Sequence, residues 1–173
     1  MSLQPGDPAP WFVAPTPSNS RYEFHMVAGR YVLLAFLPSD PAIRDPMLQA
    51  LKAHDPLFDG RNRALFGVLR DEASIARARD RGALRWVQDA GGEVSAQFGA
   101  VGPDGAQLGL YVLLDPTLRV MMTAPADRAE GLFAALSALP APEDHAGTPV
   151  SAPVLVVPRV FEPELCRTLI DYY

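Results

Sequence analysis

Cysteine is almost absent from this sequence. Cys166 is the single thiol in 173 residues, so the chain cannot form a disulfide within itself and holds no Cys-x-x-Cys motif. Dithiol–disulfide exchange within one chain is therefore excluded.

Long apolar runs and dense basic clusters are also missing. No run approaches the roughly 20 apolar residues that a membrane-spanning helix needs, and the first residues lack the charged and apolar regions of a signal peptide. The net charge is -5, and the spaced arginines at 77, 79 and 81 are mixed with acids, as on a solvated helix face. We therefore expect no nucleic-acid partner, no membrane partner and a cytoplasmic location.

Metal and phosphate motifs are lacking as well. His25, His54 and His145 are scattered, and no His-x-Asp pair occurs. The glycine pair Gly91-Gly92 has no Lys-Ser/Thr after it, so we interpret it as a turn and not a phosphate loop. We expect no metal site and no cofactor.

A buried strand and the helix after it form the centre of the sequence. Residues 31–37 are an uncharged apolar run that ends at Pro38, which is typical of a strand covered on both faces. Asp45 is a suitable N-cap and Pro46 a suitable first helical residue, so the pattern predicts a helix that begins there. The free N–H groups of such a helix would lie at the sheet edge where α/β folds place their chemistry.

The remaining patterns complete an α/β layer with a mixed sheet flanked by helices. Predicted strands occupy 64–69, 108–115 and 118–123, the last two as a hairpin. Predicted helices occupy 72–81, capped by Asp71, then 93–98, and a final apolar stripe capped by Asp127. In the N-terminal arm, over residues 4–20, we expect Trp11 and its apolar neighbours to anchor the arm on the core.

Several segments resemble the peroxiredoxin family, also known as alkyl hydroperoxide reductase/thiol-specific antioxidant proteins. The resemblance runs in order over about residues 4–139 and implies a peroxiredoxin-type, thioredoxin-like fold and a homodimer. The segments that carry it are Gly6-Asp7-Pro8-Ala9-Pro10-Trp11-Phe12, residues 29–38, Phe66-Gly67-Val68-Leu69-Arg70-Asp71, Trp86-Val87-Gln88-Asp89, residues 94–99 and Tyr111-Val112-Leu113-Leu114-Asp115.

The chemistry of that family does not carry over. Its motif P-x-x-x-T-x-x-C, with an arginine before a later strand, holds a cysteine thiolate that attacks peroxide. Counted from Pro38, Ala42 takes the threonine position, Asp45 the cysteine position and Gly109 the arginine position. The resemblance thus implies four vestigial positions and no catalytic residue. Asp45 would serve as a structural cap, or alternatively keep a ligand-binding role.

The composition changes after residue 139. Residues 140–153 are rich in proline and predict a linker between a domain at 1–139 and a further segment at 154–173. That segment predicts a strand over 154–157 and a helix from about Pro163. It resembles the opening of prolyl-hydroxylase-like oxygenases, which use iron(II) and 2-oxoglutarate, and so implies a truncated C-terminal oxygenase domain.

Three functions are compatible with the sequence. The first is a non-catalytic docking or dimerisation module of a larger oxygenase. The second is a thiol peroxidase that acts through Cys166 or an unusual site, and the third is a small-molecule binder that uses the pocket near Pro38, Asp45 and Gly109. We expect Cys166 to be a small, partly buried residue of an amphipathic helix, because a resolving cysteine would need a second thiol.

Overall fold

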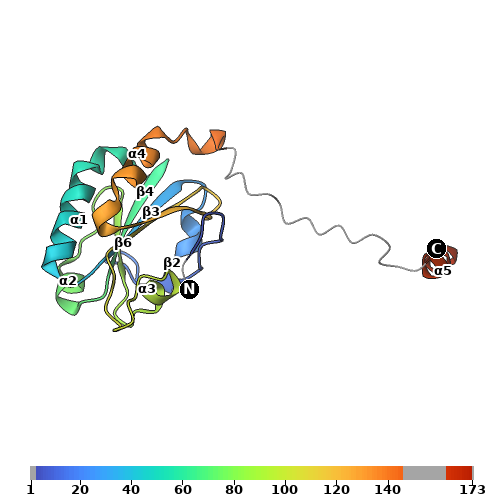
Figure 1. Cartoon of the computed structure of the whole chain (residues 1–173), viewed down its shortest axis with the longest axis horizontal. Coiled ribbons are helices and arrows are strands. Elements are labelled where there is room, and N and C mark those ends of the chain that lie inside the picture. The colour runs from blue at the N-terminus through green and yellow to red at the C-terminus, as the bar shows by residue number, and fades with distance from the viewer. Residues whose placement is uncertain (1–2, 146–162, 173) are drawn as a thin grey trace.

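A five-stranded mixed sheet forms the centre of the computed structural model, which describes residues 3–145 and 163–172 (Figure 1). The strand order is β5-β4-β3-β6-β7, with β3, β4 and β5 parallel and the β6–β7 hairpin antiparallel. The strands are β3 (Tyr31–Leu37), β4 (Arg63–Leu69), β5 (Leu84–Gln88), β6 (Leu110–Leu114) and β7 (Val120–Pro125). The parallel unit followed by a hairpin is the predicted topology.

Strand β3 lies in the middle of the sheet and is buried on both faces. All seven of its residues are 0% exposed, because β4 and β6 flank it and a separate apolar layer covers each face. The uncharged run in the sequence is explained by this double burial. The predicted central strand is confirmed.

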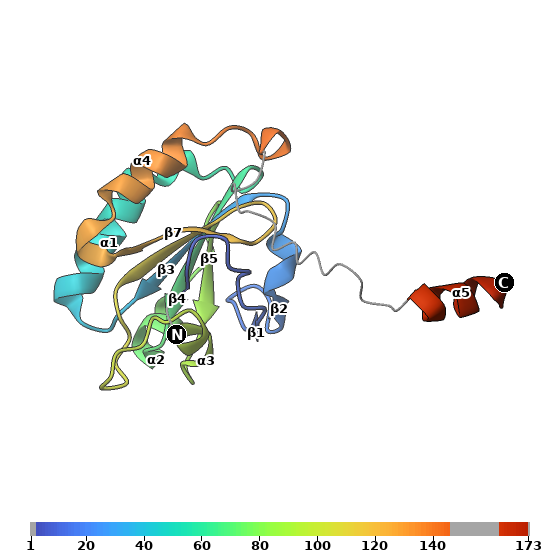
Figure 2. The same cartoon turned by 45° about the vertical axis from the view of Figure 1, so that its right-hand side comes forward.

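Helices cover both faces of the sheet. In Figures 1 and 2, α1 (Pro41–Ala53) and α4 (Glu130–Ala138) lie side by side on one face, where Met47, Leu51 and Phe133 pack. The other face carries α3 (Glu93–Gln97) and the N-terminal pair β1 (Val13–Ala14) and β2 (Tyr22–Glu23), together with the 3-10 turn η1 (Phe24–Val27). This arrangement is the predicted α/β architecture.

Trp11 corrects the prediction for the N-terminal arm. Its side chain is 74% exposed and its ring lies 5.4 Å from that of His25, whereas Phe12 is buried and stacks on Phe24 at 4.5 Å. Neighbouring residues of an extended chain point to opposite sides, so only one of the two rings can reach the core. Phe12 is therefore the anchor.

Two helix boundaries also differ from the prediction. Helix α2 (Glu72–Arg77) begins at the predicted cap, Asp71, but ends at Arg77, because Ala78 is extended with ψ 135°. Asp127 does not cap the last helix. It lies in the 3-10 turn η3 (Ala126–Arg128), and α4 begins at Glu130 without a side-chain cap.

The end of the chain is described in two pieces. Residues Pro142–Asp144 of the predicted linker form the 3-10 turn η4, and α5 (Pro163–Asp171) confirms the helix predicted from Pro163. The strand predicted at 154–157 lies outside the described residues, and the domain boundaries remain predictions. Within residues 3–145 and 163–172, no helix has the length and apolar character needed to span a bilayer.

Candidate functional site

Helix α1 starts five residues before the position that the sequence predicted. Asp40 is its N-cap and accepts a hydrogen bond of 2.9 Å from the N–H of Ala42, and Pro41 is the first helical residue. The prediction that Asp45 caps this helix is therefore wrong. Pro46 lies inside the helix, where it cannot donate a backbone hydrogen bond.

Asp45 lies beyond the first turn of α1. Its side chain is 57% exposed, and its Oδ1 lies 3.1 Å from both Nε and Nη2 of Arg44. The carboxylate is thus an exposed, ion-paired group. The free N–H groups of the helix N-terminus lie at Asp40 and not around Asp45.

A cavity of about 520 Å³ lies where β3 ends and α1 begins. Pro38 is the one vestigial position that lines it; Ala42, Asp45 and Gly109 do not. Arg70 also lines this cavity and donates to the carbonyl of Gly105 at 2.9 Å. The structure therefore does not bring the four predicted positions together in one pocket.

Gly109, the arginine position of the resemblance, has no room for a side chain. A Cβ there would lie 2.8 Å from Cγ2 of Ile43 and 2.8 Å from Cβ of Ala126, with Sδ of Met47 at 3.2 Å. Contacts this short force neighbouring atoms to move, and Ala126 is held by its N–H bond of 2.9 Å to the carbonyl of Gly109. The packing of α1 at the start of β6 thus leaves an arginine at this position no room unless Ile43 and Ala126 move.

Cys166 corrects the expectation of partial burial. It lies in α5 as an exposed free thiol. Its neighbour Arg167 pairs with Glu164 at 2.7 Å, so that guanidinium is already engaged by a carboxylate.

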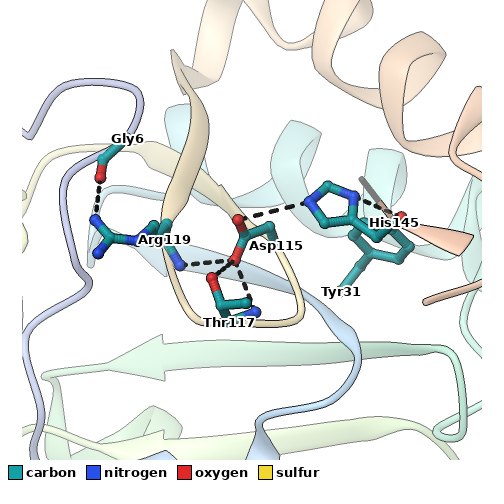
Figure 3. Close-up of polar contacts among 6 residues, drawn as sticks. All are labelled: Gly6, Tyr31, Asp115, Thr117, Arg119 and His145. Atoms are coloured by element: carbon teal, nitrogen blue, oxygen red, sulfur yellow. Dashed lines mark hydrogen bonds and ion pairs between the residues drawn. The ribbon is translucent and has the colours of Figure 1, made fainter. Parts of the chain in front are cut away.

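A buried polar cluster that sequence reasoning missed lies at the opposite end of β3 (Figure 3). A hydrogen bond of 3.0 Å joins the Tyr31 hydroxyl to Nδ1 of His145, and Nε2 of His145 lies 3.6 Å from Oδ2 of Asp115. Asp115 is itself held by Thr117 and Arg119, whose N–H groups donate to its Oδ1 at 2.8 and 2.9 Å.

This cluster connects the start of the predicted linker to the sheet. Burial raises the pKa of the Tyr31 hydroxyl; Arg63 opposes the shift, and Asp115 and Asp144 add to it. Because Tyr31 and Asp115 are 0% and 1% exposed, we interpret the cluster as a structural contact. Only tertiary structure joins residues 31, 115 and 145, so no local sequence signal predicts it.

No metal-binding geometry is found in the part of the chain that the structure describes. Over residues 3–145 and 163–172, no group of three His, Cys, Asp or Glu side chains could hold an ion.

Comparison with known proteins identifies similarity through structure only. No protein-family model matches the chain, and no curated protein matches it. The mitochondrial 2-Cys peroxiredoxin of Plasmodium falciparum superposes with a TM-score of 0.64 at 15% identity, over 78% of this chain and 92% of its own. AhpC of Mycobacterium tuberculosis gives 0.64 at 17% identity, over 80% and 93%.

A third solved structure extends the pattern. The reduced 2-Cys peroxiredoxin of Plasmodium vivax gives a TM-score of 0.62 at 22% identity, over 80% of this chain and 96% of its own. Identities this low establish the fold and not the activity. The chain has a peroxiredoxin-type, thioredoxin-like fold.

Proposed function

We propose that residues 1–139 form a peroxiredoxin-like domain that does not reduce peroxides and serves as a docking or dimerisation module of a larger oxygenase. The observation that carries the proposal is the state of two positions. Asp45, which the resemblance assigns to the thiol position, is exposed and paired with Arg44, and an arginine in place of Gly109 would displace both Ile43 and Ala126.

The chemical reason lies in the attacking group. Peroxide reduction by this fold needs a thiolate, which is oxidised reversibly to a sulfenic acid. A carboxylate does not enter that cycle.

The context in an oxygenase remains part of the proposal. Its support is the C-terminal resemblance, together with the helix from Pro163, which the spacing of the apolar residues predicted. We also propose that the protein is a homodimer and lies in the cytoplasm. The resemblance to peroxiredoxins supports the dimer, and the low cysteine content suits a reducing compartment.

One observation favours the alternative of a thiol peroxidase. Cys166 is exposed, so peroxide and a reductant could both reach it. Against this alternative, its neighbour Arg167 is paired with Glu164 and leaves no free adjacent cation to hold a thiolate.

A hydroperoxide-consumption assay on the whole chain, with dithiothreitol as reductant, separates the two functions. We expect the chain and its Cys166→Ser variant to consume hydrogen peroxide at the rate of buffer plus reductant. Turnover that exceeds this background and disappears in Cys166→Ser would refute the proposal and establish the alternative.

A further inference from the structure

A groove runs along α1 on the side of the edge strand β5. Two adjoining cavities of about 470 and 230 Å³ form it, and Leu48, Arg81, Leu84 and Trp86 line both. On the α1 side it extends from Arg44 to Lys52, which is about 12 Å at 1.5 Å per helical residue.

The groove exists because α2 is short. The chain leaves the helix after Arg77 and passes without regular structure to β5, so part of the sheet face stays uncovered. Trp86 forms the floor there: its ring lies directly over Gly67, where any Cβ would overlap it, and its indole N–H donates to the carbonyl of Arg79 at 3.0 Å. The apolar floor is thus held in place.

Positive charge gathers around this floor. Five of the chain's 15 lysines and arginines line the two cavities, but only two of its 20 acids do, in a protein whose net charge is -5. No ion pair within the described residues engages the exposed arginines at 77, 79 and 81. The sequence predicted a helix over 72–81, but α2 ends at Arg77, so Arg79 and Arg81 lie outside it. The cations are Arg44, Lys52, Arg77, Arg79 and Arg81, and the acids Asp45 and Asp55.

The placement of these cations selects one class of occupant. Arg77 and Arg79 line the larger cavity, Lys52 lines the smaller, and Arg81 lies between the two. A fatty acid carries its charge at one end only, so it would not meet cations spread along the groove. A nucleic acid has no apolar stripe that could pack on Leu48, Leu84 and Trp86. An amphipathic helix with acidic flanks offers both features along its whole length.

We propose that this groove binds an acidic amphipathic helix of a partner protein. Apolar side chains of that helix would pack on Leu48, Leu84 and Trp86, and its carboxylates would meet the arginines of the rim. The inference rests on the proposed docking function and specifies its partner. Peroxide turnover by the chain would refute the non-catalytic assignment and leave the groove intact, so the two can fail separately.

The chain's own helix α5 matches the groove poorly. Its apolar residues Leu165, Leu169 and Ile170 share one side, but at about 100° per residue Glu164 and Asp171 fall nearly opposite them. Docking the apolar side would turn both carboxylates away from the arginines. α5 is therefore an occupant that the experiment must exclude.

The experiment uses the full chain carrying Trp11→Phe, so that Trp86 is the single tryptophan. The probe is a synthetic helical peptide of about 14 residues with leucines at i, i+4 and i+7 and flanking glutamates, compared with a scrambled peptide of equal composition. We expect the helical peptide to change Trp86 emission saturably and to bind more weakly as salt rises.

Charge reversal identifies the binding surface. The pair Arg77→Glu/Arg81→Glu should weaken binding at least tenfold, whereas Arg21→Glu/Arg128→Glu, at two arginines with 79% and 80% exposed side chains outside the groove, should leave it nearly unchanged. Thermal melts by circular dichroism verify that both variants fold.

Four results would overturn the proposal. These are equal binding of the scrambled peptide, equal loss in the control pair, and displacement of the peptide by equimolar dodecanoate or duplex DNA. The fourth is a shift of Trp86 emission in Leu165→Asp/Leu169→Asp without peptide, which would identify α5 as the occupant.

Discussion

The sequence holds two Asp-Pro pairs at which helix α1 could begin, and the helix begins at the earlier pair. Asp40-Pro41 and Asp45-Pro46 offer the same cap and the same first residue, so composition alone does not separate them. Starting at Pro41 adds five residues to the helix while Met47 and Leu51 still face the core. The added turn outweighs the backbone bond that Pro46 cannot make.

This choice predicts unequal costs for two matched substitutions. Asp40→Ala should lower the free energy of unfolding by about 1 kcal/mol, the usual value of an N-cap. Asp45→Ala should change it by less than about 0.5 kcal/mol, as is usual for an exposed surface residue. Urea unfolding at pH 7 measures both. A larger loss in Asp45→Ala than in Asp40→Ala would mean that the helix begins at Asp45 in solution.

Restoring a thiol at residue 45 should not restore peroxidase activity. In Asp45→Cys the sulfur would lie past the first turn of α1, next to Arg44 but without the arginine that the resemblance expects at residue 109, where a side chain would clash with Ile43 and Ala126. We expect its second-order rate with hydrogen peroxide to stay within about tenfold of that of free cysteine, by stopped-flow measurement in a Cys166→Ser background. A rate hundreds of times higher would show that a working peroxide site persists.

The buried hydroxyl of Tyr111 should make the protein less stable at alkaline pH. Burial raises the pKa of its hydroxyl to about 12, from an ordinary value of 10.0. The unfolded chain therefore loses this proton first as the pH rises, so stability is unaffected below pH 10 and falls between about pH 10 and 12. Urea unfolding across that range should show a smaller decline in Tyr111→Phe than in the wild type. An identical decline in the two would contradict the assignment.

At the scale of elements, sequence patterns predict a strand correctly where both of its faces are buried. β3 and residues 64–69 of β4 are uncharged runs because both faces are covered, and the Asp115-Pro116-Thr117 turn identifies the hairpin. The sequence pattern did not predict β5, because this edge strand contains Arg85 and is only partly buried. A strand covered on one face has no continuous apolar run to reveal it.

Because His145 joins η4 to the sheet, we expect its substitution to loosen residues 141–145 locally. His145→Ala removes the bond to Tyr31 and the approach to Asp115. Residues 141–145 should then exchange their amide hydrogens at least several times faster by mass spectrometry, with little change in β3 and β4. His145→Gln, which keeps a polar side chain of similar reach, is the matched control. Unchanged exchange in His145→Ala would show that η4 is held by other contacts.

At the scale of the whole molecule, the layers of a peroxiredoxin-type fold are present, and we propose that the peroxide chemistry of that family is not. The sequence predicted the fold because strands, helix and hairpin come in the right order, and it identified Asp45 and Gly109 as unlike the family. It could not predict the groove. That surface combines α1 with residues 77–86, and it depends on the early end of α2, which no residue near Arg77 signals.

The reactivity of the sole thiol tests the central claim most directly. Cys166 oxidation by hydrogen peroxide can be timed by intact-protein mass spectrometry after alkylation quench, beside free cysteine in the same buffer at pH 7. We predict a second-order rate constant within about tenfold of that of free cysteine, because the exposed thiol has no unpaired cation beside it in sequence. A rate constant several hundredfold above free cysteine would contradict the account and identify the chain as a peroxidase.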